Sequence, residues 1–323
     1  FYYYGDTRGI EPQFYYLAKV PEAMGHEVDF FDWHTHAKPE MGGPAHMRRI
    51  FLSLLKSGNY DVALIATYKD EFDRETLEEA KKYTTTVAFN SDDEWRWGDY
   101  SAGRAGWYTF MVTNSPRVYA EQRGTVGNLL HCQWGCTGFW RGDQTPKDVP
   151  FSFAGMIYGS RKEQIQHLYK HAGLAAFGMG VKDLNLPPRA ELPADLRDPK
   201  FQTTLSFEAI NRLWNRSRVS FTPLDSSDGT TRQIKSRVFD MGLSGTLMLA
   251  HSVPELERYY EPGKEYVAFE TLEDAADKAR FYLRNEPARR KIAEAYARRT
   301  EAEHLWSQRL AAVFDGAGLV GKN

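Results

Sequence analysis

The chain has 323 residues, a length that suits one large or two medium domains. Hydrophobic residues make up 42% and charged residues 26% of it, which is the composition of an ordinary soluble globular protein. The net charge of −2 gives no overall field that would favour nucleic acid or acidic membranes. The sequence contains no apolar run of about 18 residues, so it predicts no membrane span.

The cysteine content argues against a fold stabilised by disulfides. Cys132 and Cys136 are too few for a disulfide framework or for a complete zinc site. A reducing, cytoplasmic setting is therefore the default expectation. The sequence begins with Phe1 inside a strand-like segment, so we expect the natural N-terminus to lie upstream, and a targeting segment stays open.

The first half of the chain alternates strand and helix patterns. Strands are expected at 1–5, 26–33, 61–67, 85–90, 107–114 and 127–134, and helices at 10–24, 47–57 and 73–83. Ser115 and Pro116 begin a further helix, with proline at the first helical position. Such alternation predicts a parallel sheet covered by helices.

The second half repeats this organisation. Strands are expected at 151–155, 175–180, 219–223, 246–250 and 266–269, and helices at 160–171, 206–216, 254–260 and 271–284, with two more in 286–316. Ser160 and Glu163 have the spacing of a capping box. The Pro-rich segment 185–202 predicts an irregular excursion loop.

These patterns predict an α/β protein with two Rossmann-like domains, 1–146 and 147–323, that face each other across a cleft. The last helix is a candidate to cross back to the first domain. Ligands of open α/β sheets bind beyond the carboxyl ends of the strands. We therefore expect the chemistry at those strand ends, in the cleft.

The segment 228–250 is the first candidate site. Gly229, Thr230 and Thr231 predict a flexible loop whose hydroxyls can cap a following helix, and Gly245 fits the left-handed residue that closes it. Ile234, Val238 and Met241 recur at helical spacing, and the apolar run 246–250 then predicts a buried central strand.

A helix N-terminus beside such a loop is a natural seat for a phosphate. Lys235 and Arg237 add positive charge, and Asp240, one turn after Arg237, can accept hydrogen bonds from ribose hydroxyls. An ordinary amphipathic helix with a solvated charged face is the alternative reading of the same residues.

Three further places in the second half match a known family. They are 153–155 with Arg161, the run 236–245, and the tail 256–283. In their order and spacing these motifs resemble the CgeB-like glycosyltransferases, relatives of the retaining family-four enzymes with two Rossmann domains (the GT-B fold). The first half shares only the architecture and the phrase Gly25-His26-Glu27-Val28.

The resemblance implies transfer of a sugar from a nucleotide-diphosphate sugar, with the donor on the C-terminal domain and the acceptor on the N-terminal one. It implies no metal, because basic side chains and a helix N-terminus neutralise the leaving diphosphate. Arg161 would contact the diphosphate, and Asp240 would stand where the family has a ribose-binding glutamate. Arg232 replaces a second family glutamate, which leaves the donor sugar and the stereochemical outcome open.

Further candidates follow predicted strands. Asp92 follows the fourth strand, as part of an acidic triplet that a solvated loop would also explain, and His251 directly follows 246–250. His34 follows the second strand, where an imidazole can accept a proton. Trp95 and Trp97 stand in a polar loop, and aromatic faces stack on sugars as well as filling cores.

The candidate roles fall into three groups. The catalytic candidates are Arg161, Arg237 and Asp92; the donor-binding ones are Gly155, Arg161, Gly229, Thr230, Thr231, Lys235, Arg237, Asp240 and His251; the acceptor-binding ones are Arg8, His34, Trp95 and Trp97. No metal ligand is expected. Arg161→Ala is expected to reduce turnover and to leave thermal stability equal or slightly higher, because a cation at a helix N-terminus is mildly unfavourable to the helix dipole.

The sequence therefore predicts a metal-independent glycosyltransferase of the hexosyltransferase type, with a UDP- or GDP-linked donor, no cofactor, and an acceptor that is a glycan, a small molecule or a protein. No nucleic-acid partner is expected. A nucleotide-sugar epimerase or phosphorylase of the same fold is the first alternative. A non-catalytic protein that binds a sugar nucleotide is the second.

Overall fold

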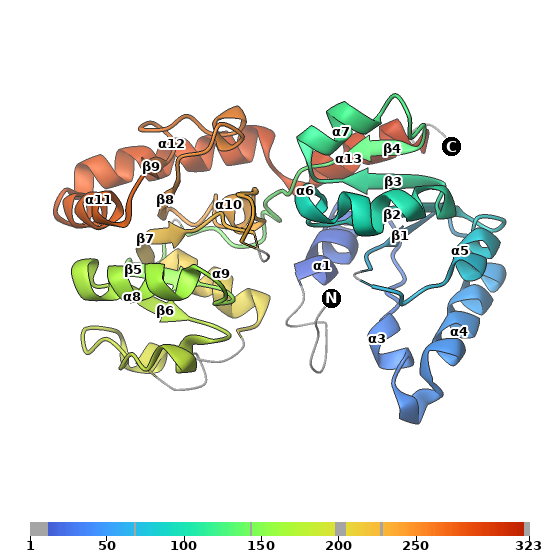
Figure 1. The fold of residues 1–323 in the computed structure, drawn as a ribbon, viewed down its shortest axis with the longest axis horizontal. Coiled ribbons are helices and arrows are strands. Elements are labelled where there is room, and N and C mark those ends of the chain that lie inside the picture. Colours follow the sequence, from blue (N-terminus) through green and yellow to red (C-terminus); the bar gives the residue numbers. More distant parts are fainter. Residues whose placement is uncertain (1–11, 68, 143, 198–204, 227–228, 320–323) are drawn as a thin grey trace. The chain divides into compact units, whose positions relative to one another are not determined.

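The computed structural model describes residues 12–67, 69–142, 144–197, 205–226 and 229–319 (Figure 1). The chain divides into two compact units, one made of 1–134 and 306–323 and the other of 135–305. The division falls earlier than the expected boundary at 146, and it assigns the last helix, α13 (Trp306–Gly316), to the first unit. The expected strand at 1–5 and the candidate Arg8 lie outside the described residues.

The N-terminal unit is built on a parallel sheet with strands in the order β1-β2-β3-β4. The strands are β1 (Val62–Ile65), β2 (Thr85–Asn90), β3 (Phe110–Thr113) and β4 (Leu129–His131). The helical segments before and between them are α1 (Pro12–Phe14), η2 (Tyr15–Lys19), α2 (Val20–Ala23), α3 (Trp33–His36), η3 (Pro39–Met41), α4 (Gly43–Ser57), α5 (Arg74–Ala80), α6 (Asp93–Arg96), η4 (Trp97–Ser101), η5 (Ala102–Trp107) and α7 (Pro116–Gln122).

Local signals explain several of these boundaries. Ser115 Oγ accepts a hydrogen bond from the Val118 amide at 3.0 Å, and Pro116 is the first residue of α7, so the predicted helix start is confirmed. Along α4, the buried residues Met47, Phe51 and Leu55 recur every four positions and join the core of this unit.

The expected strand at 26–33 is wrong. Residues 26–32 have no regular secondary structure, and Trp33 begins α3. Asp32 caps this short helix, because its Oδ1 accepts a hydrogen bond from the Thr35 amide at 3.2 Å. A strand needs a ladder partner, and the partner expected for this one, 1–5, lies outside the described residues.

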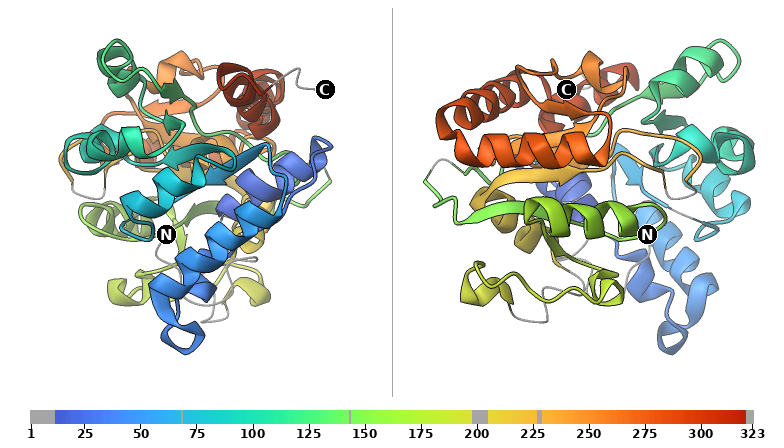
Figure 2. Two further views of the ribbon diagram at one scale, coloured as in Figure 1. Left: turned by 90° about the vertical axis from the view of Figure 1, so that its right-hand side faces the viewer. Right: turned by 60° about the vertical axis from the view of Figure 1, so that its left-hand side comes forward.

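The C-terminal unit contains a second parallel sheet, with strands in the order β6-β5-β7-β8-β9. The strands are β5 (Val149–Ala154), β6 (Ala175–Phe177), β7 (Ser217–Thr222), β8 (Leu247–His251) and β9 (Val267–Phe269). The helical segments are α8 (Arg161–Ala172), η6 (Val181–Leu184), η7 (Ala194–Arg197), α9 (Phe207–Arg216), α10 (Arg237–Asp240), η9 (Leu256–Arg258), α11 (Leu272–Arg284) and α12 (Glu286–Glu303). Two views of the ribbon in Figure 2 show these helices around the strands.

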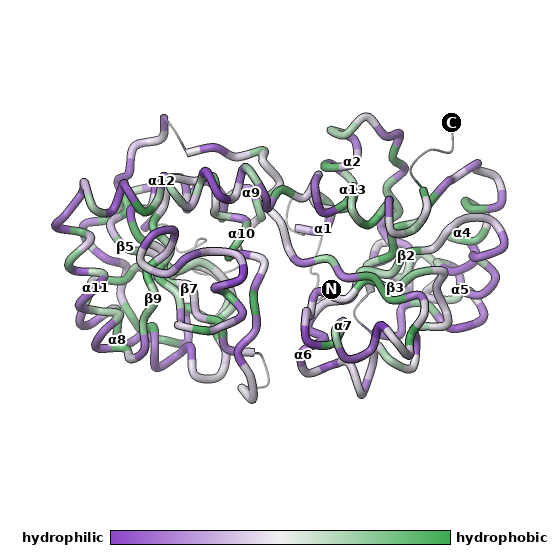
Figure 3. Tube along the Cα trace, turned by 90° about the horizontal axis from the view of Figure 1, so that it is seen from above, coloured by the Kyte–Doolittle hydropathy of each residue, from purple (hydrophilic) through white to green (hydrophobic). Residues whose placement is uncertain are grey.

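Both faces of this sheet are covered, as a parallel sheet requires. Phe151 and Phe153 pack in the core that includes residues of α8 and α11, whereas Ala154 packs in a second cluster with Leu213 of α9. Figure 3 shows the hydrophobic colour toward the strands and more hydrophilic colour on the outside of α11. In the described part of the chain, every helix is too short or too polar to cross a membrane.

One expectation about a helix start is corrected by the structure. Ser160 does not cap α8, because its own backbone is already helical (φ −60°, ψ −19°) and its side chain accepts no capping bond. Its Oγ instead accepts a hydrogen bond from the side-chain Nε2 of Gln164 at 3.3 Å. Gly245 does adopt the left-handed conformation predicted for it, with φ +72°.

The long helix expected after Thr231 is reduced to α10, which has four residues. The segment before it folds as a hairpin-like loop, in which the Ser226 amide donates to Thr231 O and the Gln233 amide donates to Leu224 O. Thr230 and Thr231 therefore do not cap a helix. Pairing across the loop satisfies the backbone groups that a helix would otherwise have used.

Candidate functional site

The carboxyl ends of β5, β7 and β8, three adjacent strands, bring together four of the nine predicted donor-binding residues: Gly155, Arg161, Arg237 and His251. The chain after β5 forms the loop 155–160, and the chain after β7 forms the loop 223–233. His251 ends β8, and α10 begins shortly before that strand. This edge is where open α/β sheets bind ligands.

Arg161, the first residue of α8, is buried, with 1% of its surface exposed. Its Nη1 donates to Met156 O and its Nη2 to Asp225 O, each at 3.0 Å. The guanidinium also lies 3.9 Å from the centre of the Tyr158 ring. Arg161 therefore links the loops after β5 and β7, and the alternative reading as a surface arginine is excluded.

Arg237, the first residue of α10, brings a second guanidinium to the same edge. Its Nη1 donates to Ala154 O at 3.2 Å, and the group lies 5.2 Å from the centre of the Phe153 ring. Burial, and then the charge of Arg161, lower the pKa of Arg237 to about 9. Arg161 is buried and Arg237 is partly buried, and two neighbouring cations that repel each other form a site that a polyanion would stabilise.

Gly155 makes room for this arrangement. Its φ is +146°, a conformation that residues with a side chain rarely adopt. A Cβ atom at this position would lie 2.8 Å from Nη2 of Arg237. The glycine predicted at the donor site thus lets the Arg237 guanidinium lie directly against the backbone.

His251 is held in one protonation state. Its Nδ1 accepts a hydrogen bond from the Leu224 amide at 3.1 Å, so the neutral ring carries its proton on Nε2. The residue is 3% exposed and packs on the Phe269 ring, with the ring centres 4.5 Å apart. Burial lowers the pKa of His251 to about 4.

This pKa predicts a pH-dependent stability. The folded value of about 4 lies below the ordinary value near 6.5, so between these pH values the unfolded chain binds a proton that the folded protein excludes. The free energy of unfolding should be fully maintained above pH ~6.5 and decrease on the order of 1–3 kcal/mol toward pH ~4. Urea titrations across this range should show a smaller decrease for His251→Asn, which keeps an acceptor for the Leu224 amide. An identical decrease in both proteins would contradict the assignment.

Asp225 is a site residue that the sequence reading missed. Its Oδ2 accepts a hydrogen bond from Gln164 Nε2 at 2.9 Å, and Arg232 Nε lies 3.9 Å from its Oδ1. Its carbonyl oxygen is one of the acceptors for Arg161. Its position just after the central strand β7 was the available signal, since that strand end faces the ligand edge of such sheets.

The other donor-side candidates lie in different surroundings. Asp240 ends α10 and is buried, and Lys235 is partly buried just before that helix. Gly229, Thr230 and Thr231 form the exposed tip of the loop after β7. Their backbone amides therefore do not belong to a helix N-terminus, although the loop begins at the carboxyl edge of the sheet.

In the N-terminal unit, the acidic triplet after β2 separates into different roles. Asp93 is fully buried and accepts a hydrogen bond from Ser101 Oγ at 2.6 Å, and burial raises its pKa to about 6. Glu94 pairs with Arg117 at 3.0 Å. Asp92 is only partly buried and has φ +65°, which is uncommon for a residue with a side chain.

The three acceptor-side candidates within the described ranges lie in different surroundings. Trp97 packs against the hydrophobic core, and the indole N–H of Trp95 is buried without a hydrogen-bond partner among the described residues. His34 lies in α3, with its ring 5.7 Å from that of Trp33. Their roles remain predictions.

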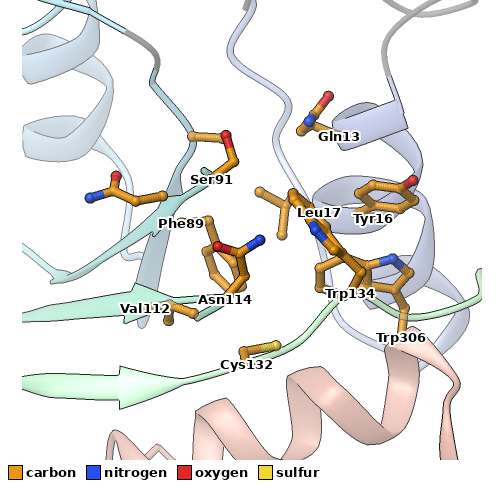
Figure 4. A pocket seen from close by; sticks show the side chains of 12 residues that line it. Gln13, Tyr16, Leu17, Phe89, Ser91, Val112, Asn114, Cys132, Trp134 and Trp306 are labelled. Atoms are coloured by element: carbon orange, nitrogen blue, oxygen red, sulfur yellow. The ribbon is translucent and has the colours of Figure 1, made fainter. Parts of the chain in front are cut away.

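A pocket lies at the carboxyl ends of β1, β2, β3 and β4 (Figure 4). Its cavity volume is about 20 Å³, the scale of one water molecule. Its lining contains Tyr16, Trp134 and Trp306 but none of the three described acceptor candidates. The sequence reading missed it because these aromatic residues are far apart along the chain.

The candidate metal ligands form no closed site in the part of the chain that the structure describes. Within the described ranges, no group of three or more His, Cys, Asp or Glu residues is arranged to hold a metal ion. Cys132 and Cys136 are both buried free thiols, and burial raises the pKa of each to about 12. Metal independence itself stays a prediction.

Comparison with known proteins gives the fold a context. Residues 182–315 match the family model described as glycosyl transferase-like, whereas the curated proteins gave no match. A glycosyltransferase from Rickettsia africae ESF-5 is similar in structure, with a TM-score of 0.55 at 12% identity, over 95% of this chain and 88% of that one. Anabaena Alr3699/HepE, solved with UDP and glucose, gives a TM-score of 0.57 at 10% identity, over 84% and 81% of the two chains. The fold is GT-B.

The pneumococcal O-GlcNAc transferase GtfA, solved with UDP and GlcNAc, is another GT-B neighbour, with a TM-score of 0.56 at 12% identity. The alignment covers 87% of this chain and 61% of GtfA. The matched family region includes Arg237, Asp240 and His251, but it begins after Gly155 and Arg161. The GT-B fold of this chain is therefore shown, and the role of each site residue is a matter for proposal.

Proposed function

We propose that this protein is a metal-independent glycosyltransferase that moves a sugar from a nucleotide-diphosphate sugar to an acceptor, with the donor bound by the C-terminal unit. The observation that carries the proposal is the pair of neighbouring guanidinium groups at the carboxyl edge of the sheet, Arg161 buried and Arg237 partly buried. Each is oriented by bonds to backbone carbonyl oxygens. Guanidinium groups bind phosphate oxygens two at a time, which suits a diphosphate.

The chemistry follows from where charge develops. The bond between the sugar C1 and the diphosphate oxygen breaks, and its electron pair leaves with the diphosphate. The acceptor oxygen forms the new bond to C1 and gives its proton to a base, for which Asp92 is the candidate. Negative charge on the diphosphate grows in the transition state, so fixed cations lower the barrier as well as the dissociation constant of the donor.

Other site residues would complete donor recognition. The Nε2–H of His251 is a fixed hydrogen-bond donor, because its tautomer is set by the Leu224 amide. Asp240 and Lys235 are the candidates for the ribose and the phosphates. The glycosyl transferase-like match and the UDP complexes of HepE and GtfA support a UDP-linked donor, and the resemblance to the CgeB-like subgroup is part of this proposal.

The proposal predicts that UDP binds equally well in EDTA and in magnesium. The two guanidinium groups supply the positive charge that a bound metal ion would otherwise supply. Calorimetric titration of UDP and GDP under both conditions measures this directly. Loss of UDP binding on chelation would show that a metal is needed and would contradict the prediction.

Turnover separates the proposal from its alternatives. Labelled UDP- and GDP-sugars, incubated with the protein, should release nucleoside diphosphate, slowly with water and faster with a suitable acceptor. An isomerised nucleotide sugar would indicate an epimerase. Transfer to phosphate would indicate a phosphorylase. Binding without any reaction across the donor and acceptor panels would indicate a non-catalytic binding protein.

A further inference from the structure

Helix α8 carries a pair of histidines one turn apart on the same face. His167 and His171 are four residues apart, which places their side chains next to each other on the helix surface. Their ring centres lie 4.5 Å apart, and the ring planes differ by 37°. His171 is exposed and His167 is partly buried, so solvent reaches the histidine pair. The proposed transfer chemistry uses neither of them.

A carboxylate from a second helix stands beside the histidine pair. Helices α8 and α11 pack against each other, and their apolar residues share one core (Figure 1). Glu273, the second residue of α11, places its Oε1 3.9 Å from Nε2 of His167. The side chain of Glu273 is 76% exposed, so it can change rotamer without disturbing that core. The histidine pair therefore has a movable, negatively charged neighbour.

Further charges surround the histidine pair on both helices. Arg280 of α11 donates to the carbonyl oxygen of His171, and its own charge is offset by an ion pair with Asp277. Lys170 is an exposed cation beside the pair on α8. Glu163, also exposed, lies one turn before the first histidine and adds a carboxylate on the same face. Carboxylates thus offset the nearby cations, so a metal ion placed here meets no excess of positive charge.

The spacing of the two rings suits a shared metal ion. An imidazole nitrogen lies about 2.0–2.1 Å from a bound zinc ion, so two such ligands of a tetrahedral ion are about 3.3 Å apart and their ring centres about 5 Å apart. The observed separation of 4.5 Å is close to this value. Two histidines at the same spacing on one helix face bind zinc in metalloproteases. Small side-chain rotations would therefore bring both imidazoles to one ion.

We propose that His167 and His171 chelate one divalent transition-metal ion on the surface of α8, in front of Glu273. Imidazole nitrogen suits copper, nickel and zinc, whereas magnesium and calcium prefer oxygen ligands. Within the described ranges, no third His, Cys, Asp or Glu residue already converges on the pair, so water fills the remaining positions of the ion. The site is therefore open, and its metal ion is exchangeable.

The proposed ion lies away from the donor-binding edge. Arg161 is the first residue of α8, six residues before His167 and ten before His171. At the helical rise per residue, the histidine pair is about 9–15 Å along the helix from Arg161. The proposal therefore does not rest on the transfer reaction, and the ion has no part in neutralising the diphosphate. Because the ion binds the folded helix, it stabilises the C-terminal unit.

Calorimetric titration of the untagged full chain tests the proposal. The probes are the chlorides of copper(II), nickel(II) and zinc, with magnesium chloride as the counterpart, in a buffer that does not coordinate metals. Copper should bind more tightly than nickel or zinc, the order expected for nitrogen ligands. The electron paramagnetic resonance spectrum of the first equivalent of copper should show coupling to imidazole nitrogen. Absence of binding by all three transition metals, or equally tight binding of magnesium, would overturn the proposal.

Variants show whether the ion binds at the histidine pair. His167→Ala and His171→Ala should each weaken metal binding about 10²-fold, because each change turns a two-point chelate into a single imidazole. His46→Ala is the matched control. His46 is also a partly exposed histidine of a helix, α4, but it has Gly42 and Ile50 one turn away on either side. Unchanged binding in both pair variants, or an equal loss in His46→Ala, would place the ion elsewhere and overturn the proposal.

A UDP titration of the same variants, freed of metal, keeps this site apart from the donor site. His167→Ala and His171→Ala should bind UDP as the unchanged protein does. Loss of UDP binding together with metal binding would place the ion at the donor edge and overturn the proposal of a separate site. Metal binding that depends on the histidine pair, in a protein that binds neither UDP nor GDP, would support the metal site and contradict only the transferase proposal.

Discussion

Arg161→Met is expected to reduce turnover by about 10²–10³-fold, the scale of losing one preorganised charge that stabilises a transition state. The loss should appear in the rate of the chemical step as well as in donor affinity, because charge on the leaving diphosphate grows as the bond breaks. Arg161→Lys should recover only part of the activity, since an ammonium cannot make two parallel bonds to phosphate. Single-turnover kinetics with a UDP-sugar measure both effects.

The same variant should also destabilise the fold, in contrast to the expectation from the sequence. The Arg161 guanidinium satisfies the carbonyl oxygens of Met156 and Asp225, and removing it leaves both without this donor. The free energy of unfolding should fall on the order of 1–3 kcal/mol.

Arg289→Met separates stability from function. Arg289 is equally buried and donates to the carbonyl oxygens of Arg218 and Gly245, but it belongs to α12 and not to the candidate site. The Arg289→Met variant should be less stable, but its folded molecules should bind the donor with unchanged affinity. Full activity in folded Arg161→Met would remove Arg161 from the site.

Gly155→Ala is expected to lower donor affinity and turnover by about 10- to 100-fold, because the Arg237 guanidinium would have to move to admit the new Cβ atom, which would lie 2.8 Å from Nη2. The positive φ of +146° adds backbone strain. Titration with UDP, together with thermal unfolding, measures the two consequences separately.

Gly263→Ala is the matched control for Gly155→Ala. Gly263 also has a positive φ, +77°, but a Cβ atom there would have no neighbour within 4 Å. It should therefore show the strain without the loss of donor affinity. If both variants bound UDP alike, the contact between Gly155 and Arg237 would have no role in the site.

Local chemistry made much of the fold predictable. The strand 85–90 was predicted with its observed bounds, Ser115 with Pro116 marked the start of α7, and Gly245 has the left-handed conformation predicted for it, although α10 ends earlier, at Asp240. Each of these features depends on residues close together in the sequence, where capping, steric freedom and apolar runs act directly.

The features that sequence reasoning missed depend on distant partners. The segment 229–233 pairs across its own loop instead of beginning a long helix. The helical spacing of the apolar residues that follow gives no sign of this pairing. The burial of Arg161 depends on the carbonyl of Asp225, more than sixty residues away. The aromatic pocket needs Tyr16, Trp134 and Trp306 together, and only the folded chain unites them.

The return of α13 to the N-terminal unit makes the C-terminal unit an insertion within it. Its two ends lie side by side, since the Cys136 amide donates to His304 O at 2.8 Å and Cys136 pairs with Leu305 in a parallel bridge. During synthesis, the N-terminal unit cannot bury the partners of Trp306 and Leu310 until the ribosome has made the whole inserted unit. The inserted C-terminal unit can therefore fold first. The core of the N-terminal unit is completed last, although most of its residues are synthesised first.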